Sequence, residues 1–382
     1  MNALPPARAW TICGLLFFAT ALSFLDRQVL SVLAPDLTAE FSMSNSVYSR
    51  VVFAFVASYT AMFALGGRLM DALGTRLGLG LSVGLWSLAS AAHAWARGPR
   101  TLGVARFFLG VGEGACFPAA TKGAVEWMPS ERRALAVGIA NGGSAFGAVL
   151  APPLTAWWAT VFGWRGAFLA TAVIGAVWLL AWQAALRGLP SERPAPAASG
   201  GAGFRALLSR PEVRRLLIAR FCFDPVFYFY MFWIPQYLSR ERGLSLAEIG
   251  ALTWIPFFAL GMTNIAAGSV SDRLVAHGWD ARRARITLML AAALLTPASW
   301  MASLASTVPM AITLMSVLML AHGVWIANFI TLVGDTVASH EVGTAVGLTG
   351  TSGGIAGMMS SLAVGPVVDR FSFTPVFFVS AI

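Results

Sequence analysis

The stretch that decides the fold is Leu102–Met128, which reads LGVARFFLGVGEGACFPAATKGAVEWM. It is apolar and glycine-rich, and at 1.5 Å per residue it is long enough to cross the hydrocarbon core of a bilayer, about 30 Å thick. It nevertheless contains Arg106 and Glu113. Ionisable residues inside a spanning helix are costly and normally face a protein interior or a watery cavity. Positions 106 and 113 differ by about two helical turns and therefore share one face. We interpret this face as functional; the alternative is a buried structural ion pair.

The rest of the chain has the same character. Of its 382 residues, 57% are apolar and only 11% are charged, and the mean hydropathy is +0.72. This composition predicts an all-α polytopic membrane protein. The net charge of +9 comes almost entirely from arginines that lie between apolar runs, with Lys122 as the only lysine. Such a distribution sets membrane topology and argues against nucleic-acid binding.

The chain contains six apolar runs of membrane-spanning length, then a linker, then six further apolar runs, of which the last is short. The runs are Thr11–Leu33, Val47–Met70, Leu77–Ala96, Leu102–Met128, Ala134–Val161, Gly166–Leu186, Leu216–Leu238, Ile249–Val270, Ile286–Ala305, Pro309–Val337, Gly343–Val368 and one that starts at Thr374. We expect an N-terminal six-helix bundle over 1–187, a cytoplasmic linker over 188–212 that contains RPAPAASGGAG, and a C-terminal bundle over 213–382. The last run covers only about 13 Å of helix, so we expect a truncated twelfth helix whose remainder follows Ile382.

The arginines also predict the orientation. The linker region and the connection after the eighth run are rich in arginine, whereas the connection after the first run carries Asp36 and Glu40. Arginine and lysine concentrate on the cytoplasmic side of membrane proteins. Both termini are therefore expected in the cytoplasm, with the chain in a cell inner membrane.

An internal repeat relates the two halves. GGRLMDALGTR (Gly66–Arg76) resembles GSVSDRLVAHG (Gly268–Gly278), and EWMPSERRALAVGIANGG (Glu126–Gly143) aligns at an offset of 209 with DTVASHEVGTAVGLTGTS (Asp335–Ser352). Parallel six-span repeats place a substrate site between the halves near mid-membrane. At the same offset of 209, Glu113 aligns with His322. We predict that His322 lines the same cavity and contacts substrate; the alternative is a histidine that only packs helices.

The first repeated segment carries a recognisable motif. Its glycine, aspartate and arginine spacing resembles the signature loop of the major facilitator superfamily, which occurs again in reduced form in the second half. The resemblance implies that the loop acts as a conformational lock between helices. The residues that carry this role are Gly67, Asp71, Arg76, Asp272 and Arg273. Asp71 is expected to accept hydrogen bonds from a helix N-terminus while arginines pair nearby.

A narrower resemblance comes from SFLDRQVLSVLAP (Ser23–Pro35), from ARFFLGVGEGACFPAATKGAVEWMPSERR and from FWIPQYL (Phe232–Leu238). These segments resemble the anion:cation symporter family and, within it, the hexuronate transporters. The resemblance implies proton-carrying roles for Asp26 and Glu113. It also implies that Arg27 and Arg106 bind the substrate carboxylate and that Tyr59 lies in the substrate cavity.

The residues themselves support these roles. Neighbouring positions on a helix point about 100° apart, so Asp26 can titrate while Arg27 holds an anion. A guanidinium matches a carboxylate in a bidentate way that an ammonium does not. We expect the protonation of Glu113 to depend on whether Arg106 holds substrate. Three further hydroxyl groups are candidate substrate contacts, with helix packing as the alternative: Tyr228, Thr351 and Ser352.

The function that follows is proton-coupled import of a small organic anion, a hexuronate such as glucuronate or galacturonate, by a monomer in the bilayer. Within transport, the alternatives are a symporter for another sugar acid (an aldonate or glucarate) or an exchanger of phosphorylated anions. A transport-like membrane sensor is the alternative from a different class. An enzyme is not expected, because the chain has no HExxH motif and no clustered His/Cys pattern. No cofactor or metal is expected either, because the three cysteines lack metal-ligand spacing.

Overall fold

The computed structural model describes residues 5–189, 204–338 and 341–382, and within these ranges every regular element is helical. Eight of the helical segments are long and apolar enough to cross a membrane. The predicted all-α polytopic class is therefore confirmed. Of the predicted linker, RPAPAASGGAG lies outside the described residues, and the six residues Phe204–Ser209 after it form a short helix, α8.

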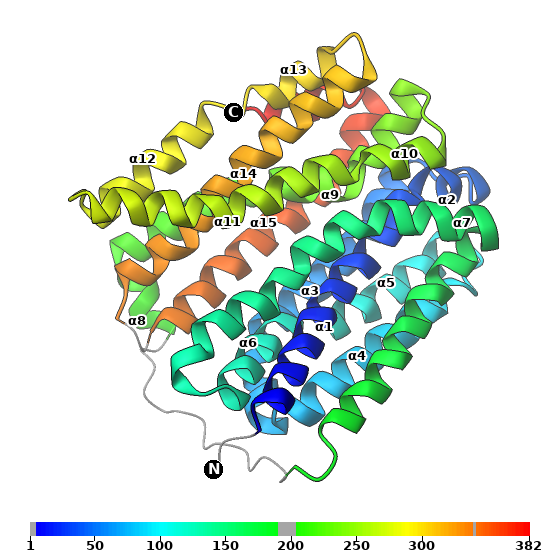
Figure 1. Cartoon of the computed structure of the whole chain (residues 1–382). Coiled ribbons are helices and arrows are strands. Elements are labelled where there is room, and N and C mark those ends of the chain that lie inside the picture. The colour runs from blue at the N-terminus through cyan, green and yellow to red at the C-terminus, as the bar shows by residue number, and fades with distance from the viewer. Residues whose placement is uncertain (1–4, 190–203, 339–340) are drawn as a thin grey trace. The chain divides into compact units, whose positions relative to one another are not determined.

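The described chain forms two compact units (Figure 1). The first contains residues 5–43 and 47–189, and the second contains 44–46 together with 204–338 and 341–382. The first unit is built from α1 (Pro6–Val32), α2 (Ala34–Glu40), α3 (Asn45–Leu73, apart from its first two residues), α4 (Thr75–His93), α5 (Pro99–Glu113), α6 (Cys116–Trp127), the 3₁₀ turn Ser130–Arg132 and α7 (Arg133–Ala185).

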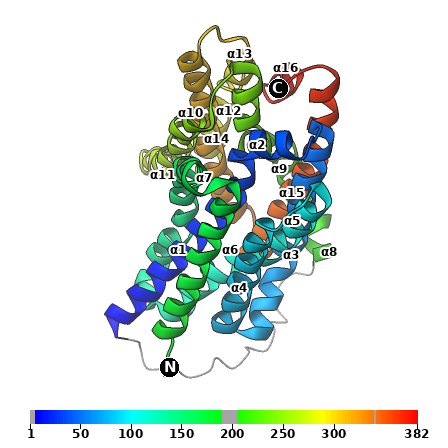
Figure 2. The same cartoon turned by 90° about the vertical axis from the view of Figure 1, so that its right-hand side faces the viewer.

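The second unit is built from the remaining helices. They are α8, α9 (Pro211–Arg242), α10 (Leu246–Leu252), α11 (Trp254–Ala276), α12 (Ala281–Ala293), α13 (Ala298–Leu304), α14 (Val308–Thr336), α15 (Val342–Arg370) and α16 (Thr374–Val379). Figure 2 shows α13 and α16 side by side, and there the ring of Trp300 meets that of Phe378 edge to face at 5.6 Å.

Local sequence signals explain where several helices begin. Proline stands at the first position of α1, α5 and α9, where the missing N–H costs no helical hydrogen bond. Ser245 and Glu248 form a capping box at the start of α10. The side chain of Asp280 accepts a hydrogen bond from the backbone N–H of Arg283 and so caps α12.

Gly163 separates the fifth and sixth predicted spans. Both lie within α7, in which Gly163 alone has non-helical angles (φ 70°, ψ 171°). This left-handed region is easily adopted only by glycine. Figure 1 shows α7 as two helical arms that run back along each other.

Leu102–Met128, which we predicted as one helix, is divided in the structure. Its two parts are α5 and α6, which are separated at Gly114–Ala115 directly after Glu113. Gly110 and Gly114 lie against the backbone of α3, and even a methyl group at either position would overlap that backbone. The glycines therefore let α5 approach α3 closely, and this approach places Glu113 deep inside the unit.

Candidate functional site

An ion pair lies at the centre of the first unit. Arg27 of α1 donates to one carboxylate oxygen of Glu113, Oε2, from Nη2 at 3.1 Å and from Nε at 3.3 Å. The Ser23 hydroxyl donates to the same oxygen at 3.1 Å. Glu113 is 0% exposed, and its other oxygen, Oε1, has no hydrogen-bond partner. The site thus holds a buried carboxylate with one oxygen saturated and the other available to a proton.

Aromatic rings form the wall around Arg27. Its guanidinium carbon lies 4.2 Å from the ring centroid of Phe24 and 4.6 Å from that of Tyr59, distances at which a cation is attracted to a ring face. Tyr59 is itself buried and stacks on Phe55 at 5.7 Å. The structure therefore places Tyr59 next to Arg27, so that both residues can contact one ligand.

Asp26 and Arg27 point to different partners, as their helical geometry predicts. Asp26 Oδ1 accepts a hydrogen bond from Ser90 of α4 at 2.9 Å, and the Ser90 hydroxyl lies 2.8 Å from that of Thr171 in α7. The second oxygen, Oδ2, is buried without a partner. Asp26 therefore occupies a polar pocket of its own among α1, α4 and α7.

Arg106 is placed differently from our expectation. It is 0% exposed and donates from Nη2 to the backbone carbonyl of Arg27 at 2.7 Å. Its Nε and Nη1 are buried without a hydrogen-bond partner. The residue that pairs with Glu113 is Arg27, and the expected dependence of Glu113 protonation on substrate at Arg106 stays a prediction. The hydrogen bond from Nη2 connects the Arg106 side chain to the backbone of Arg27.

The signature loop also differs in detail from its predicted network. Asp71 accepts a hydrogen bond from Lys122 of α6 at 2.8 Å, where we expected a helix N-terminus as donor. Arg76 donates a hydrogen bond to the backbone carbonyl of Leu189, four residues after the end of α7, at 3.4 Å. Gly67 is exposed, with open space at its α-carbon. In the second unit, Asp272 and Arg273 are exposed on α11.

His322 lies in α14 of the second unit and is 6% exposed. Its ring stacks on Phe223 at 4.2 Å and on Phe227 at 5.2 Å, and its Nδ1 is buried without a hydrogen-bond partner. Glu113 belongs to the other unit. The prediction that His322 and Glu113 line the same cavity therefore stays a prediction.

The other candidates of the second unit make helix contacts. Tyr228 packs over Gly357, where a methyl group would overlap its ring. Thr351 donates to the carbonyl of Gly347 in its own helix at 2.8 Å, and Ser352 donates to the carbonyl of Leu217 in α9 at 2.9 Å. The prediction that Tyr228, Thr351 and Ser352 contact substrate stays a prediction.

One charged pair escaped the sequence reasoning. Arg220 and Asp224 lie one turn apart on α9, within the apolar run Leu216–Leu238, and form an ion pair at 2.7 Å. The signal that singled out Arg106 and Glu113, ionisable residues inside a spanning segment, is equally present here.

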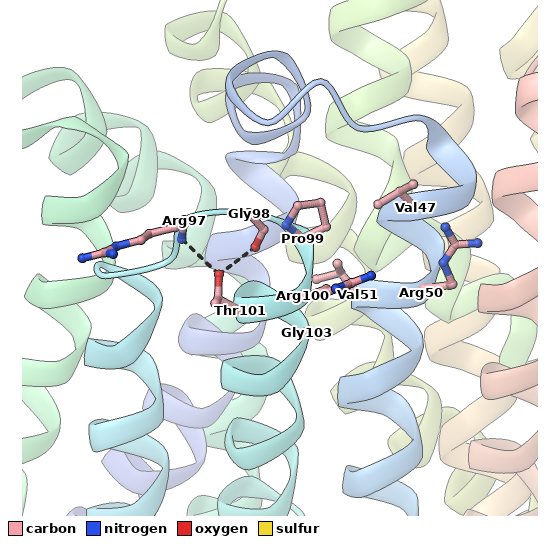
Figure 3. Close-up of a pocket in the computed structure, with 9 residues that line it drawn as sticks. All are labelled: Val47, Arg50, Val51, Arg97, Gly98, Pro99, Arg100, Thr101 and Gly103. Carbon is pink, nitrogen blue, oxygen red and sulfur yellow. Dashed lines mark hydrogen bonds between the residues drawn. The ribbon is translucent and has the colours of Figure 1, made fainter.

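A surface pocket of about 750 Å³ lies apart from all these residues. It is lined by α3 and by the connection that enters α5, and Arg50, Arg97 and Arg100 contribute to its wall (Figure 3). The Thr101 hydroxyl fixes the connection by donating to the carbonyl of Gly98 at 2.8 Å. Figure 3 shows the Arg97 side chain directed away from Arg50, so the three cations do not converge on one point.

The model of the Major Facilitator Superfamily matches residues 16–361. The chain therefore belongs to the major facilitator superfamily and is a membrane transporter, which confirms the resemblance and the expectation that it is not an enzyme. A crystal structure of a bacterial homolog to the human lysosomal transporter Spinster, inward-facing and unoccupied, shares the fold with a TM-score of 0.79 at 20% identity. The match covers 96% of this chain and 84% of that one.

Three relatives of the chain are named as transporters of hexuronates or of galacturonate. The hexuronate transporter of Escherichia coli K12 is 29% identical over 392 aligned positions, which cover 98% of this chain and 90% of the relative. The galacturonate transporter of Dickeya chrysanthemi is 31% identical over 277 positions, covering 68% and 80%. The hexuronate transporter of Bacillus subtilis 168 is 28% identical over 370 positions, covering 93% and 87%.

Proposed function

We propose that the protein is a proton-coupled symporter that imports a hexuronate, such as D-glucuronate or D-galacturonate, by alternating access. The observation that carries the proposal is the buried ion pair of Arg27 and Glu113. In this pair the Glu113 carboxylate binds the guanidinium that we expect to bind the carboxylate of the substrate. The names of the relatives support the choice of hexuronate.

The pair suggests how proton and anion are coupled. While Glu113 is ionised, its carboxylate satisfies Arg27 and competes with any substrate carboxylate. A proton bound at Oε1, the oxygen without a partner, removes the negative charge that faces Arg27. The substrate carboxylate then replaces that charge, because a nearby anion stabilises a buried cation. Each ligand therefore favours binding of the other, which is the requirement of symport.

Arg106 and Tyr59 complete the proposed site. The two buried donors of Arg106 that lack a partner, Nε and Nη1, suit a second carboxylate oxygen or a sugar hydroxyl. Tyr59 supplies a ring and a hydroxyl beside Arg27. From the second unit, the substrate contacts proposed are His322, Tyr228, Thr351 and Ser352. The lock residues are Gly67, Asp71, Arg76, Asp272 and Arg273, with Lys122 added as the partner of Asp71.

Asp26 is proposed as a second proton carrier. Moving a monoanion into a negative interior costs about 2.3 kcal/mol per 100 mV, so one proton cancels the charge and a second makes the potential favourable. Asp26 is buried, and one of its oxygens has no partner. Import by a monomer in a bacterial inner membrane, with both termini in the cytoplasm, is the corresponding cellular arrangement.

Counterflow in proteoliposomes tests the proposal. Vesicles are loaded with unlabelled D-glucuronate, and entry of labelled D-glucuronate is measured against competing galacturonate, galactonate, glucarate, sulfoacetate and a sugar phosphate. We expect rapid entry that the two hexuronates inhibit most. Stronger inhibition by another sugar acid or by the sugar phosphate would favour those alternatives. Absence of counterflow with every anion would favour a sensor.

A further inference from the structure

The second unit contains a charged pair with no role in the proposed coupling. Arg220 and Asp224 of α9 have side chains that are only 19% and 10% exposed, and the Nε of Arg220 lies 2.7 Å from both carboxylate oxygens of Asp224. The pair is enclosed in an apolar run of a spanning helix. Ionisable residues in such a place are expensive and usually serve a function.

Asp224 is held in place by a neighbouring helix. Gly353 of α15 lies directly against its carboxylate, so that a methyl group at that position would overlap it. The carboxylate therefore has little freedom to move, and it fixes the guanidinium through Nε. The Arg220 guanidinium carbon also lies 5.6 Å from the ring centroid of Phe329 in α14. Two contacts thus orient the guanidinium, one from its own helix and one from α14.

The outer edge of this guanidinium is unused. Within the described part of the chain, Nη1 and Nη2 of Arg220 make no hydrogen bond, and neither is among the fully buried polar atoms. They form the paired N–H edge that binds a carboxylate in a bidentate way. Arg106 differs, because its unpartnered nitrogens are fully buried and its Nη2 is already bonded.

An aromatic row borders the pair. Phe223 stacks on His322 at 4.2 Å and on Trp325 at 3.6 Å, and Trp325 stacks on Phe329 at 4.7 Å. Phe329, at one end of this row, is the ring that the Arg220 guanidinium faces. At the other end, Nδ1 of His322 is buried without a hydrogen-bond partner.

We propose that Arg220 is an anion-binding residue of the second unit, which donates hydrogen bonds from Nη1 and Nη2 to oxygen atoms of the transported anion, and that Asp224 is its positioning residue. This inference rests on the proposed function, because it assumes that the transported molecule is a carboxylate. The alternative is a structural ion pair that only joins α9 to its neighbours.

Neutralising both partners separates the two readings. Removal of Arg220 alone leaves a buried carboxylate without a partner and is expected to harm folding whatever the pair does. The double variant Arg220→Gln/Asp224→Asn removes both charges and keeps similar volume and hydrogen-bonding groups. If the pair is structural, this variant folds and binds like the wild type. If Arg220 binds the anion, the variant folds but binds the anion at least tenfold more weakly.

The matched control is the pair of Arg210 and Glu341 in the same unit. Their side chains are in contact at 2.7 Å, and both precede the helices on which the tested pair and Gly353 lie. The variant Arg210→Gln/Glu341→Gln removes the same two charges outside the spanning helices. We expect it to bind anions like the wild type.

The experiment measures the Kd of the purified full chain in detergent by titration calorimetry, with thermal unfolding as the check on folding. The wild type is titrated with D-glucuronate, D-galacturonate, D-galactonate, glucarate, sulfoacetate and inorganic phosphate, and the tightest anion is then used on the variants. We expect the Arg220→Gln/Asp224→Asn variant to unfold cooperatively and to bind at least tenfold more weakly. A Kd within twofold of the wild type would overturn the inference while leaving the proposed function intact.

Two single variants test the division of roles. Asp224→Asn is expected to raise the KM for counterflow severalfold with little change in its maximal rate, and Asp224→Glu is expected to restore part of the loss. A purely structural role would reduce the amount of folded protein without changing KM, which would overturn the positioning role. Binding of a non-carboxylate anion alone, or of no anion by the wild type, would refute the proposed function and this inference together.

Discussion

Replacement of Glu113 by glutamine is the perturbation with the clearest expected result. Glutamine keeps a carbonyl oxygen within reach of the Ser23 hydroxyl and of Arg27, which contact Oε2 of Glu113 at 3.1–3.3 Å. It cannot take up or release a proton. We therefore expect exchange of substrate to survive and accumulation to stop, because exchange needs only the substrate-loaded transporter to change between its outward-facing and inward-facing forms.

The size of the effect follows from the coupling. Each proton carried down a gradient of one pH unit contributes about 1.4 kcal/mol, a factor of about ten, so the two protons proposed here correspond to about a hundredfold accumulation of a monoanion at zero potential. The wild type should approach this ratio in proteoliposomes with clamped potential, and Glu113→Gln should give a ratio near one. Breaking a buried ion pair costs about 3–5 kcal/mol, and the retained amide oxygen should keep the loss of stability below that range.

The assay compares labelled glucuronate inside and outside the vesicles with and without the pH gradient, alongside counterflow without a gradient. Glu131→Gln is the matched control, because Glu131 is exposed in the 3₁₀ turn before α7, where it accepts a hydrogen bond from the neighbouring Ser130 hydroxyl. It should accumulate substrate like the wild type. Tenfold accumulation by Glu113→Gln would show that the proton is carried elsewhere and would refute the reasoning.

Three further outcomes are expected. Arg106→Lys should weaken anion binding about tenfold to a hundredfold, since lost charge-assisted hydrogen bonds are worth roughly 1.5–3 kcal/mol each, and near-wild-type affinity by calorimetry would remove Arg106 from the site. Gly147→Val should lower the thermal stability, by about 1–3 kcal/mol or more, because any side chain there overlaps the backbone of Ala21 in α1; an unchanged unfolding temperature would contradict this packing. Lys122→Gln should change stability by less than about 1 kcal/mol, because its partner Asp71 is half exposed, yet slow counterflow severalfold if the pair belongs to the lock, and an unchanged rate would exclude it.

The sequence predicted the fold class and the burial of the central charges for the same physical reason. Arg106 and Glu113 interrupt an apolar run, and the cost of a charge in hydrocarbon requires them to turn inward. The pairing could not be predicted in this way. Which arginine meets Glu113 depends on how closely α5 approaches its neighbours, and this depends on tertiary contacts such as those of Gly110 and Gly114.

Other misses have equally specific causes. The break between α5 and α6 left no signal in hydropathy, because glycine and alanine at 114–115 are as compatible with a spanning helix as with its interruption. The pairing of Lys122 with Asp71 joins two helices that are far apart in the sequence, so it could not be read from either segment alone. Arg220 and Asp224 carried the same signal as the central charges and were predictable on the rule already applied to Arg106.

The central claim, that a proton and a hexuronate cross the membrane together, is tested most directly by the internal pH of proteoliposomes. Vesicles that enclose a fluorescent pH indicator are prepared with equal pH on both sides and clamped potential, and D-glucuronate is added outside while a labelled portion reports its entry. The account predicts that the interior acidifies as glucuronate enters, and that Glu113→Gln vesicles show no acidification. Entry of glucuronate into wild-type vesicles without any change in internal pH would contradict it.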